Sequence, residues 1–151
     1  MIKKFIFLSL TVLMIGCDSN GQCYNSEEPG YIFMVYVSLT STTNENLIDK
    51  ESFNLNELEV ISKDNEFIGD INFNITEQNN IKLISFSIAN TNEIAFEYNN
   101  VEIGSFSIKN AKLSAIIDCV QTVESFEVYK GSTLICQCKT NDFFVIKTDV
   151  I

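Results

Sequence analysis

The chain has 151 residues with ten lysines, twenty aspartates and glutamates, no arginine and no histidine, so its formal net charge is −10. An acidic chain without guanidinium groups repels phosphate backbones, and we expect no nucleic-acid partner. The absence of histidine excludes Ser-His-Asp and Cys-His catalysis and histidine-ligated metals. The remaining carboxylate, thiol and lysine chemistries have no recognisable motif, so we expect no enzyme activity and no cofactor.

The N-terminus has the pattern of an export signal. Lys3 and Lys4 precede an apolar-rich run of eleven residues, 5–15, and Gly16 and Cys17 follow it. A charged start, a short apolar stretch and a small residue before a cleavage point are typical of secretory signal peptides. The run is too short for a membrane-spanning helix, which needs about 20 apolar residues.

The segment Leu13-Met14-Ile15-Gly16-Cys17 resembles the lipobox of bacterial lipoprotein precursors. The resemblance implies cleavage before Cys17 and a diacylglycerol on its thiol, which with further acyl chains holds a protein firmly on a bilayer. It also implies a membrane-anchored place in the bacterial cell envelope, on the periplasmic or surface face. Loss of residues 1–16 removes Lys3 and Lys4 and changes the formal net charge from −10 to −12. A plain signal peptide cleaved elsewhere is the alternative.

Two further segments follow the signal peptide. Residues 17–30 are polar and rich in turn residues, with the only proline at position 29, and we expect them to form a tether. Residues 31–151 alternate strand-like segments with turn clusters and are predicted to form a single domain.

The first half of that domain predicts several strands. Residues 31–39 are apolar on both faces, which is typical of a strand at the centre of a sheet. A short helical turn is possible at 54–58, and Leu58 and Val60 then alternate with glutamates before a hairpin turn at 63–65. After the turn, alternation over 66–76 predicts one half-buried strand with these residues on one face: Phe67, Gly69, Ile71, Phe73 and Ile75.

The middle of the domain predicts hairpins with asparagine turns. A strand at 81–89 follows the Asn79-Asn80 turn, and strands at 94–98 and from Val101 onward flank Asn99-Asn100. Ile84, Phe86 and Ile88 are predicted to form the inner face of the strand at 81–89. The apolar residues stand at odd-numbered positions before Gly104 and at even-numbered positions after it. A β-bulge at Gly104 would restore the register and keep them all on the inner face.

The last third predicts a hairpin and a closing strand at 143–146. A three-residue loop at 129–131 would place Phe126 opposite Leu134 and Glu124 opposite Cys136. A two-residue loop would instead mix Phe126 with Ile135. We prefer the first choice, because it gathers an apolar set on one face: Val120, Phe126, Val128, Leu134, Cys136 and Cys138.

About eight short strands, frequent asparagine turns and no helical period favour an all-β fold. The expected architecture is an antiparallel β-sandwich, immunoglobulin-like or transthyretin-like, with a small β-barrel as the alternative. Both architectures bury one face of every strand, so periodicity does not separate them. The mature domain is also similar to small β-rich lipoproteins, from which no residue role can be carried over.

Four cysteines remain when Cys17 carries lipid: Cys23, Cys119, Cys136 and Cys138. An even number in an exported chain favours two disulfides among three pairings. Because a direct Cys136–Cys138 bond would strain a strand, we expect each of the two to pair elsewhere. A Cys119 bond to either would contribute about 3 kcal/mol. A thiol redox pair at Cys136-Gln137-Cys138 is the functional alternative, but no environment that lowers a thiol pKa is apparent.

Two sets of carboxylates are weaker candidates. Asp64, Glu66 and Asp70 crowd one predicted hairpin and offer oxygen ligands of the kind that Ca²⁺ prefers, but their spacing does not match the helix-loop-helix calcium loop. Charged turn residues facing water explain them as well, so we assign no metal. Glu57 and Glu59 would share a strand face, as glycosidase carboxylates do and as many solvated residues do.

These observations favour a lipid-anchored binding or structural module of the cell envelope that holds a protein or glycan partner. Exposed aromatic residues such as Tyr24, Tyr98 or Tyr129 could stack on a sugar ring. The acidic charge suits a basic partner, so the alternative function is an inhibitor of a cationic envelope hydrolase such as lysozyme. A carboxylate or thiol enzyme is the least favoured hypothesis.

Overall fold

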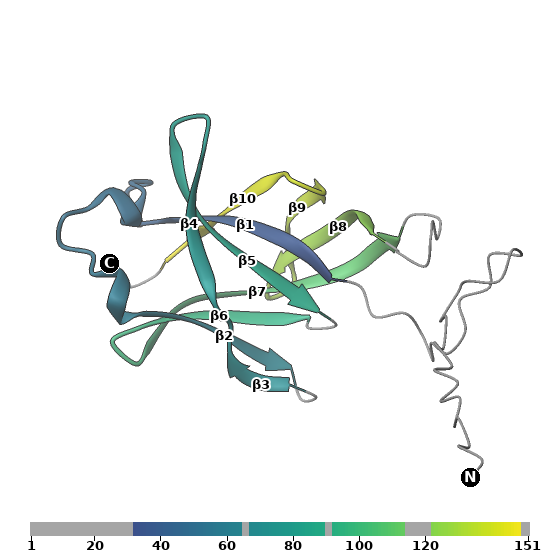
Figure 1. Ribbon diagram of the computed structural model, residues 1–151, viewed down its shortest axis with the longest axis horizontal. Coiled ribbons are helices and arrows are strands. Elements are labelled where there is room, and N and C mark those ends of the chain that lie inside the picture. The colour runs from purple at the N-terminus through teal and green to yellow at the C-terminus, as the bar shows by residue number, and fades with distance from the viewer. Residues whose placement is uncertain (1–31, 65–66, 90–91, 114–121, 149–151) are drawn as a thin grey trace, which may run out of the picture.

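The computed structural model describes residues 32–64, 67–89, 92–113 and 122–148 (Figure 1). These ranges contain two short 3₁₀ helices, η1 (Leu47–Asp49) and η2 (Leu55–Glu57), and no helix in them is long and apolar enough to cross a membrane. The strands are β1 (Ile32–Thr40), β2 (Leu58–Asp64), β3 (Phe67–Asp70), β4 (Phe73–Gln78), β5 (Ile81–Ala89), β6 (Glu93–Tyr98), β7 (Val101–Leu113), β8 (Val123–Lys130), β9 (Thr133–Lys139) and β10 (Phe143–Lys147).

Several sequence-based expectations concern positions outside the described residues. They are the signal peptide 1–16, the tether 17–30, and the side chains of Cys17, Cys23, Tyr24, Glu66, Cys119 and Val120.

The strands form two sheets that do not close on each other. One sheet has four strands in the order β10-β1-β5-β4, and the other has six in the order β3-β2-β6-β7-β8-β9 (Figure 1). The expected all-β sandwich is therefore confirmed, and the barrel alternative is wrong. The strand pairings are antiparallel as expected, with one exception among the described strands, because β1 pairs with β10 in parallel. As predicted, β1 lies inside its sheet, between β10 and β5.

One core fills the space between the two sheets. Alternate residues of β1, β2, β5 and β10 point into it, which is the period of two expected for strands with one buried face. The predicted inner face of β5 is confirmed, since Ile84, Phe86 and Ile88 are all buried. Further buried members come from both sheets: Val35, Val37, Leu39, Val60, Ile94, Phe96, Phe106, Phe126, Val128, Phe144 and Ile146.

The asparagine turns and the bulge were correctly predicted. Asn79, Asn80, Asn99 and Asn100 all have positive φ, between 52° and 62°, as two-residue hairpin turns of type I′ require. In the β6–β7 pair the register shifts after Phe96, which pairs with Gly104 while its neighbour Glu97 pairs with Glu102. The bulge lets Ile103, Phe106 and Ile108 all face the core. The helical turn is η2, capped by Asn54.

The single strand predicted over 66–76 is two strands in different sheets. β3 pairs with β2 in the six-stranded sheet, and β4 pairs with β5 in the four-stranded sheet. Residues 71–72 connect them, and the Ile71 N–H donates to the Val60 carbonyl at 2.7 Å. Alternation continues through such a crossing, so sequence periodicity alone does not reveal it.

The β8–β9 hairpin differs from its predicted form. Lys130 pairs with Thr133, so the loop is the two-residue Gly131-Ser132, with Gly131 at φ 59°. A register shift between Val128 and Tyr129 then sets Val128 opposite Cys136 and Phe126 opposite Cys138. The predicted pairings of Phe126 with Leu134 and Glu124 with Cys136 are wrong. The bulge nonetheless places Phe126, Val128, Cys136 and Cys138 on one face, and Leu134 is 43% exposed.

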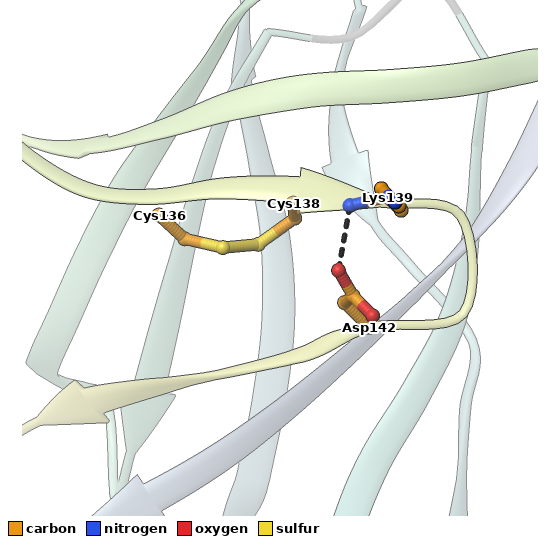
Figure 2. The surroundings of a disulfide bond; sticks show 4 residues. All are labelled: Cys136, Cys138, Lys139 and Asp142. Carbon is orange, nitrogen blue, oxygen red and sulfur yellow. Dashed lines mark hydrogen bonds between the residues drawn. A yellow bond between two sulfur atoms is a disulfide. The ribbon is translucent and has the colours of Figure 1, made fainter.

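Cys136 and Cys138 are bonded directly to each other, which corrects the expectation that each pairs elsewhere (Figure 2). Their Cα atoms are 5.3 Å apart, within the span of a disulfide. A fully extended strand would separate them by about 6.6 Å, so β9 is locally contracted. β9 can contract because it is the edge strand of its sheet and has a ladder on one side only.

The direct bond predicts a smaller stabilisation than a long loop would give. It closes a loop of three residues, for which chain entropy gives about 1.5 kcal/mol. We expect Cys136→Ala to lower the free energy of unfolding by about that amount in urea denaturation. Leu134→Ala, at an exposed position of the same strand, should change it by less than about 0.5 kcal/mol. A loss of 3 kcal/mol or more for Cys136→Ala would contradict this account.

Candidate functional site

The outer face of the six-stranded sheet carries three glutamates side by side. Glu59 of β2 pairs with Glu97 of β6, and Glu97 pairs with Glu102 of β7. Paired residues of antiparallel strands point to the same side, with Cβ atoms about 4.5–5.5 Å apart. Their chain neighbours Val60, Phe96 and Ile103 are buried, so the three carboxylates face outward. We call Glu59, Glu97 and Glu102 the glutamate row.

One lysine partly neutralises this row. The Lys63 ammonium donates a hydrogen bond to Glu102, and both side chains are more than a third exposed. This bond raises the pKa of Lys63 above its ordinary value, and the charges of Glu97 and Glu93 raise it further. The pKa of Glu102 is correspondingly lowered, first by Lys63 and then by a hydrogen bond with Ser105. Like charges directly opposite each other destabilise a sheet, so the row costs folding free energy that one lysine only partly offsets.

A hollow of about 580 Å³ adjoins the row on the same face, a size within the range of ligand sites. Ser107 on β7 has a small side chain, which leaves room for the hollow above the sheet. Ser107 pairs with Glu93 on β6. Glu93 and Lys109 give its lining both signs of charge. The complete lining is Asn92, Glu93, Ser105, Phe106, Ser107, Ile108, Lys109, Asn110 and Gly131.

A hydrogen-bonded group on β7 and β8 lies beside the hollow. Asn110 Nδ2 and the Tyr129 hydroxyl each donate to Glu127 Oε2 at 2.7 Å. These bonds, led by that from Tyr129, lower the pKa of Glu127, and the same bond raises the pKa of Tyr129. Lys109 Nζ lies 5.1 Å from the centre of the Tyr129 ring, a cation–π distance. Tyr129 pairs with Ser107, so the ring is held next to the floor of the hollow.

The lowered pKa of Glu102 predicts a pH dependence of stability. A carboxylate whose pKa is depressed by folding stabilises the fold above its unfolded pKa, and this contribution is lost as the pH falls through the folded pKa. We therefore expect wild type to lose about 0.5 kcal/mol relative to Glu102→Gln between pH 7 and pH 3, as for an exposed ion pair. Urea unfolding of both proteins at each pH measures the difference. A difference that stays constant or moves the other way would contradict this assignment.

Asp64 and Asp70, two of the three weak calcium candidates, do not come together, and the third, Glu66, lies outside the described residues. Asp64 and Asp70 lie at opposite ends of the β2–β3 pairing, three residue pairs apart, which is about 10 Å along the strands. Asp64 Oδ2 accepts a hydrogen bond from the Asn92 N–H at 3.1 Å. In the described ranges, no three histidine, cysteine, aspartate or glutamate side chains are grouped so that they could hold a metal ion.

The other weak candidates have structural partners. Glu57 lies in η2 rather than on a strand with Glu59, and its carboxylate accepts a hydrogen bond from Asn54 Nδ2 at 3.0 Å. Tyr98 stacks on Phe53 with ring centres 4.6 Å apart, and its hydroxyl accepts a hydrogen bond from the Asn54 N–H. Neither arrangement offers a glycosidase pair or a free sugar-stacking ring.

Sequence reasoning missed the glutamate row. Glu97 and Glu102 are five residues apart in the chain, and only the turn at 99–100 and the bulge before Gly104 bring them opposite each other. The turn and the bulge were both predicted, so drawing their register explicitly would have revealed this pair.

No protein-family model, curated protein or solved structure matches this chain.

Proposed function

We propose that this chain is a lipid-anchored binding module of the bacterial cell envelope that holds a cationic protein partner and performs no catalysis. The glutamate row is the observation that carries the proposal. The lipobox pattern ending at Cys17 supports the anchor, and the negative net charge of the whole chain supports a positively charged partner.

The row favours a cationic partner for a thermodynamic reason. Three carboxylates in register repel one another, and Lys63 is bonded only to the end member, Glu102. Lysine or arginine side chains placed over Glu59 and Glu97 would replace that repulsion with attraction. This gain appears only in the complex. The row therefore lowers the stability of the unbound protein and strengthens binding.

The hollow beside the row supports a protein surface as the partner. A sheet face alone is nearly flat, and the hollow gives it a concave region in which a projecting side chain can be enclosed. Glu93 and Lys109 both line the hollow, so it offers one carboxylate and one ammonium group, and the excess of negative charge comes from the row beside it. A projecting side chain of the partner would find a concave shape there, and its basic neighbours would lie over the row.

The experiment is a pull-down from envelope extract with the full-length protein at low and high salt. We expect capture of a protein of basic isoelectric point, with loss of capture near 0.5 M salt because exposed charges are then screened. The triple variant Glu59→Gln, Glu97→Gln, Glu102→Gln should lose the partner. The matched variant Glu51→Gln, Glu77→Gln, Glu124→Gln removes three exposed glutamates elsewhere and should retain it. Equal capture by both variants would overturn the proposal.

The anchor has its own test. Mass spectrometry of the protein from its native cell should show an N-terminus at Cys17 that carries acyl chains, and extraction should require detergent. Cys17→Ser should release the protein into the detergent-free fraction. An intact, unacylated start would remove the anchoring part of the proposal and leave the binding face unaffected.

Inhibition of a cationic envelope hydrolase such as lysozyme is the second candidate function. It is favoured by the hollow beside the glutamate row, because a concave surface next to a row of carboxylates can cover a basic active-site rim. Residual muramidase activity in the presence of excess protein measures it directly. Inhibition that Glu97→Gln weakens would support this role, and full activity at all ratios would exclude it.

A further inference from the structure

The Cys136–Cys138 bond does not tie two elements of the fold together. Both cysteines belong to β9, and only Gln137 lies between them. A disulfide stabilises a fold more when it closes a long loop, so a three-residue loop contributes little. β9 is also held by its ladder with β8, which includes six residue pairs. The fold therefore depends little on this bond, and the bond can open without loss of the sandwich.

The C-terminal end of β9 is fixed by hydrogen bonds that do not involve the sulfur atoms. The Lys139 N–H donates to Asp142 Oδ2 at 2.8 Å (Figure 2), and the Thr140 N–H donates to the Glu124 carbonyl at 3.1 Å. Because β9 is an edge strand, its other side has no ladder with another described strand that would resist a change in length. Opening the bond would let β9 extend locally while its end stays in place.

The two cysteines differ in their exposure to solvent. Cys138 is fully buried and lies opposite Phe126, whereas Cys136 is half-buried and lies opposite Val128. Both sulfur atoms lie on the same side of β9 (Figure 2). The rate of thiol–disulfide exchange depends on which sulfur is attacked and on access to it. A thiol from solvent should therefore attack the sulfur of Cys136, with Cys138 as the shielded leaving group.

A lysine lies on the same side of the sheet as Cys136. Lys130 is two residues beyond Val128 on β8, so it is a diagonal neighbour of Cys136, with Cβ atoms about 7–8 Å apart. Its ammonium donates to the Lys147 carbonyl of β10 at 2.9 Å, which places it at the side of the sandwich where β9 and β10 come together. A nearby cation stabilises a thiolate and lowers the pKa of its cysteine. The sequence pattern did not indicate this neighbour.

We propose that Cys136–Cys138 is an exchangeable disulfide that oxidises a dithiol, with Lys130 stabilising the Cys136 thiolate. A thiolate of the dithiol attacks the Cys136 sulfur and forms a mixed disulfide, and the Cys136–Cys138 bond breaks as Cys138 leaves and takes up a proton. The second thiolate of the dithiol then attacks the dithiol sulfur of the mixed disulfide and releases Cys136. The dithiol loses two electrons and two protons and becomes a disulfide, and the two cysteines become thiols.

This chemistry goes beyond the binding of a cationic protein. The glutamate row lies on β2, β6 and β7, and the disulfide lies on the edge strand β9 of the same sheet. The reaction is stoichiometric, since one molecule of the protein oxidises one dithiol. The two roles use different residues, so each can be tested without the other.

Reduction of the folded protein is the first test. The full-length protein in neutral detergent is treated with excess dithiothreitol, a small dithiol, then with iodoacetamide and trypsin. Cleavage after Lys130 and Lys139 gives the peptide 131–139, which contains Cys136 and Cys138 and no other cysteine. We expect mass spectrometry to find both alkylated while the far-ultraviolet circular dichroism stays unchanged. A bond that opens only at urea concentrations that unfold the protein would overturn the proposal.

Single-cysteine variants test the direction of attack. Cys138→Ser leaves the half-buried Cys136, and Cys136→Ser leaves the buried Cys138. In oxidised glutathione, we expect the peptide 131–139 of Cys138→Ser to gain glutathione about tenfold faster than that of Cys136→Ser, because access limits exchange. Equal rates, or faster reaction of Cys136→Ser, would overturn the proposal.

The role of the lysine is tested in the Cys138→Ser background. Lys130→Gln should slow alkylation of Cys136 by iodoacetamide about threefold at pH 7 and shift its pH profile upward, because the thiolate is the reactive form. Lys139→Gln removes an exposed lysine of the same strand and should change neither. Tandem mass spectrometry locates the label at position 136. An equal effect of the two substitutions would overturn the assignment of Lys130.

A further control separates this site from the binding face. Glu97→Gln should leave the reaction with dithiothreitol unchanged, since Glu97 lies on β6 and not beside β9. The Cys136→Ser variant should still capture the cationic partner. A failure of the redox proposal is therefore distinguishable from a failure of the proposed binding function.

Discussion

Phe96→Ala should lower the free energy of unfolding by about 3–5 kcal/mol, the largest stability effect expected for any substitution proposed for this chain. Phe96 is fully buried on β6, and its ring centre lies 6.3 Å from that of Phe86 and 6.0 Å from that of Phe106. Phe86 belongs to the four-stranded sheet, so Phe96 contacts across the sandwich as well as along its own sheet. Alanine would remove both sets of ring contacts and leave a cavity between the sheets.

Urea denaturation followed by far-ultraviolet circular dichroism measures this effect. Ile75→Ala, at a position 36% exposed on the edge strand β4, provides the matched control and should cost less than about 1 kcal/mol. A loss below about 1.5 kcal/mol for Phe96→Ala would show that the two sheets do not share the core described above.

Glu97→Lys should weaken binding of the cationic partner about a hundredfold, which corresponds to about 2.7 kcal/mol. Glu97 is the middle member of the glutamate row, so the reversal changes the local charge by two units where the partner's positive charges are expected to lie. Like-charge contacts across an interface cost several kcal/mol. Isothermal titration calorimetry with the purified partner measures the change, and Glu77→Lys on the other sheet is the control.

The same substitution should leave the stability of the free protein unchanged or raise it by about 0.5 kcal/mol. A lysine at position 97 would lie between Glu59 and Glu102, and opposite charges in register stabilise paired strands. Weaker binding together with equal or greater stability separates a binding role from a folding role. Binding within threefold of wild type, or a marked loss of stability, would contradict the assignment.

Local chemistry made much of the fold predictable. The Asn79-Asn80 and Asn99-Asn100 pairs tolerate positive φ, so they identified two hairpins and their loop lengths. The apolar residues change from odd to even positions at Gly104, which indicated a bulge, because the residues on both sides of Gly104 can face the same core only if the register shifts. These signals depend on neighbouring residues alone, and sequence shows them directly.

Long-range placement was not predictable in the same way. The alternation over 66–76 continues through the crossing at 71–72, so nothing in the pattern marks the change of sheet. The Cys136–Cys138 bond depends on contraction of an edge strand, and edge position is a property of the whole sheet. The parallel pairing of β1 with β10, which sets Phe143 beside Tyr36, is likewise not indicated by local patterns.

Site-specific photo-crosslinking in the native cell tests the central claim most directly, that the glutamate row contacts a cationic protein. A photoreactive amino acid at position 97 should yield one crosslinked product with a protein of basic isoelectric point. The same group at position 77, on β4 of the other sheet, should yield none. No product from position 97, an acidic partner, or the same product from both positions would contradict the account.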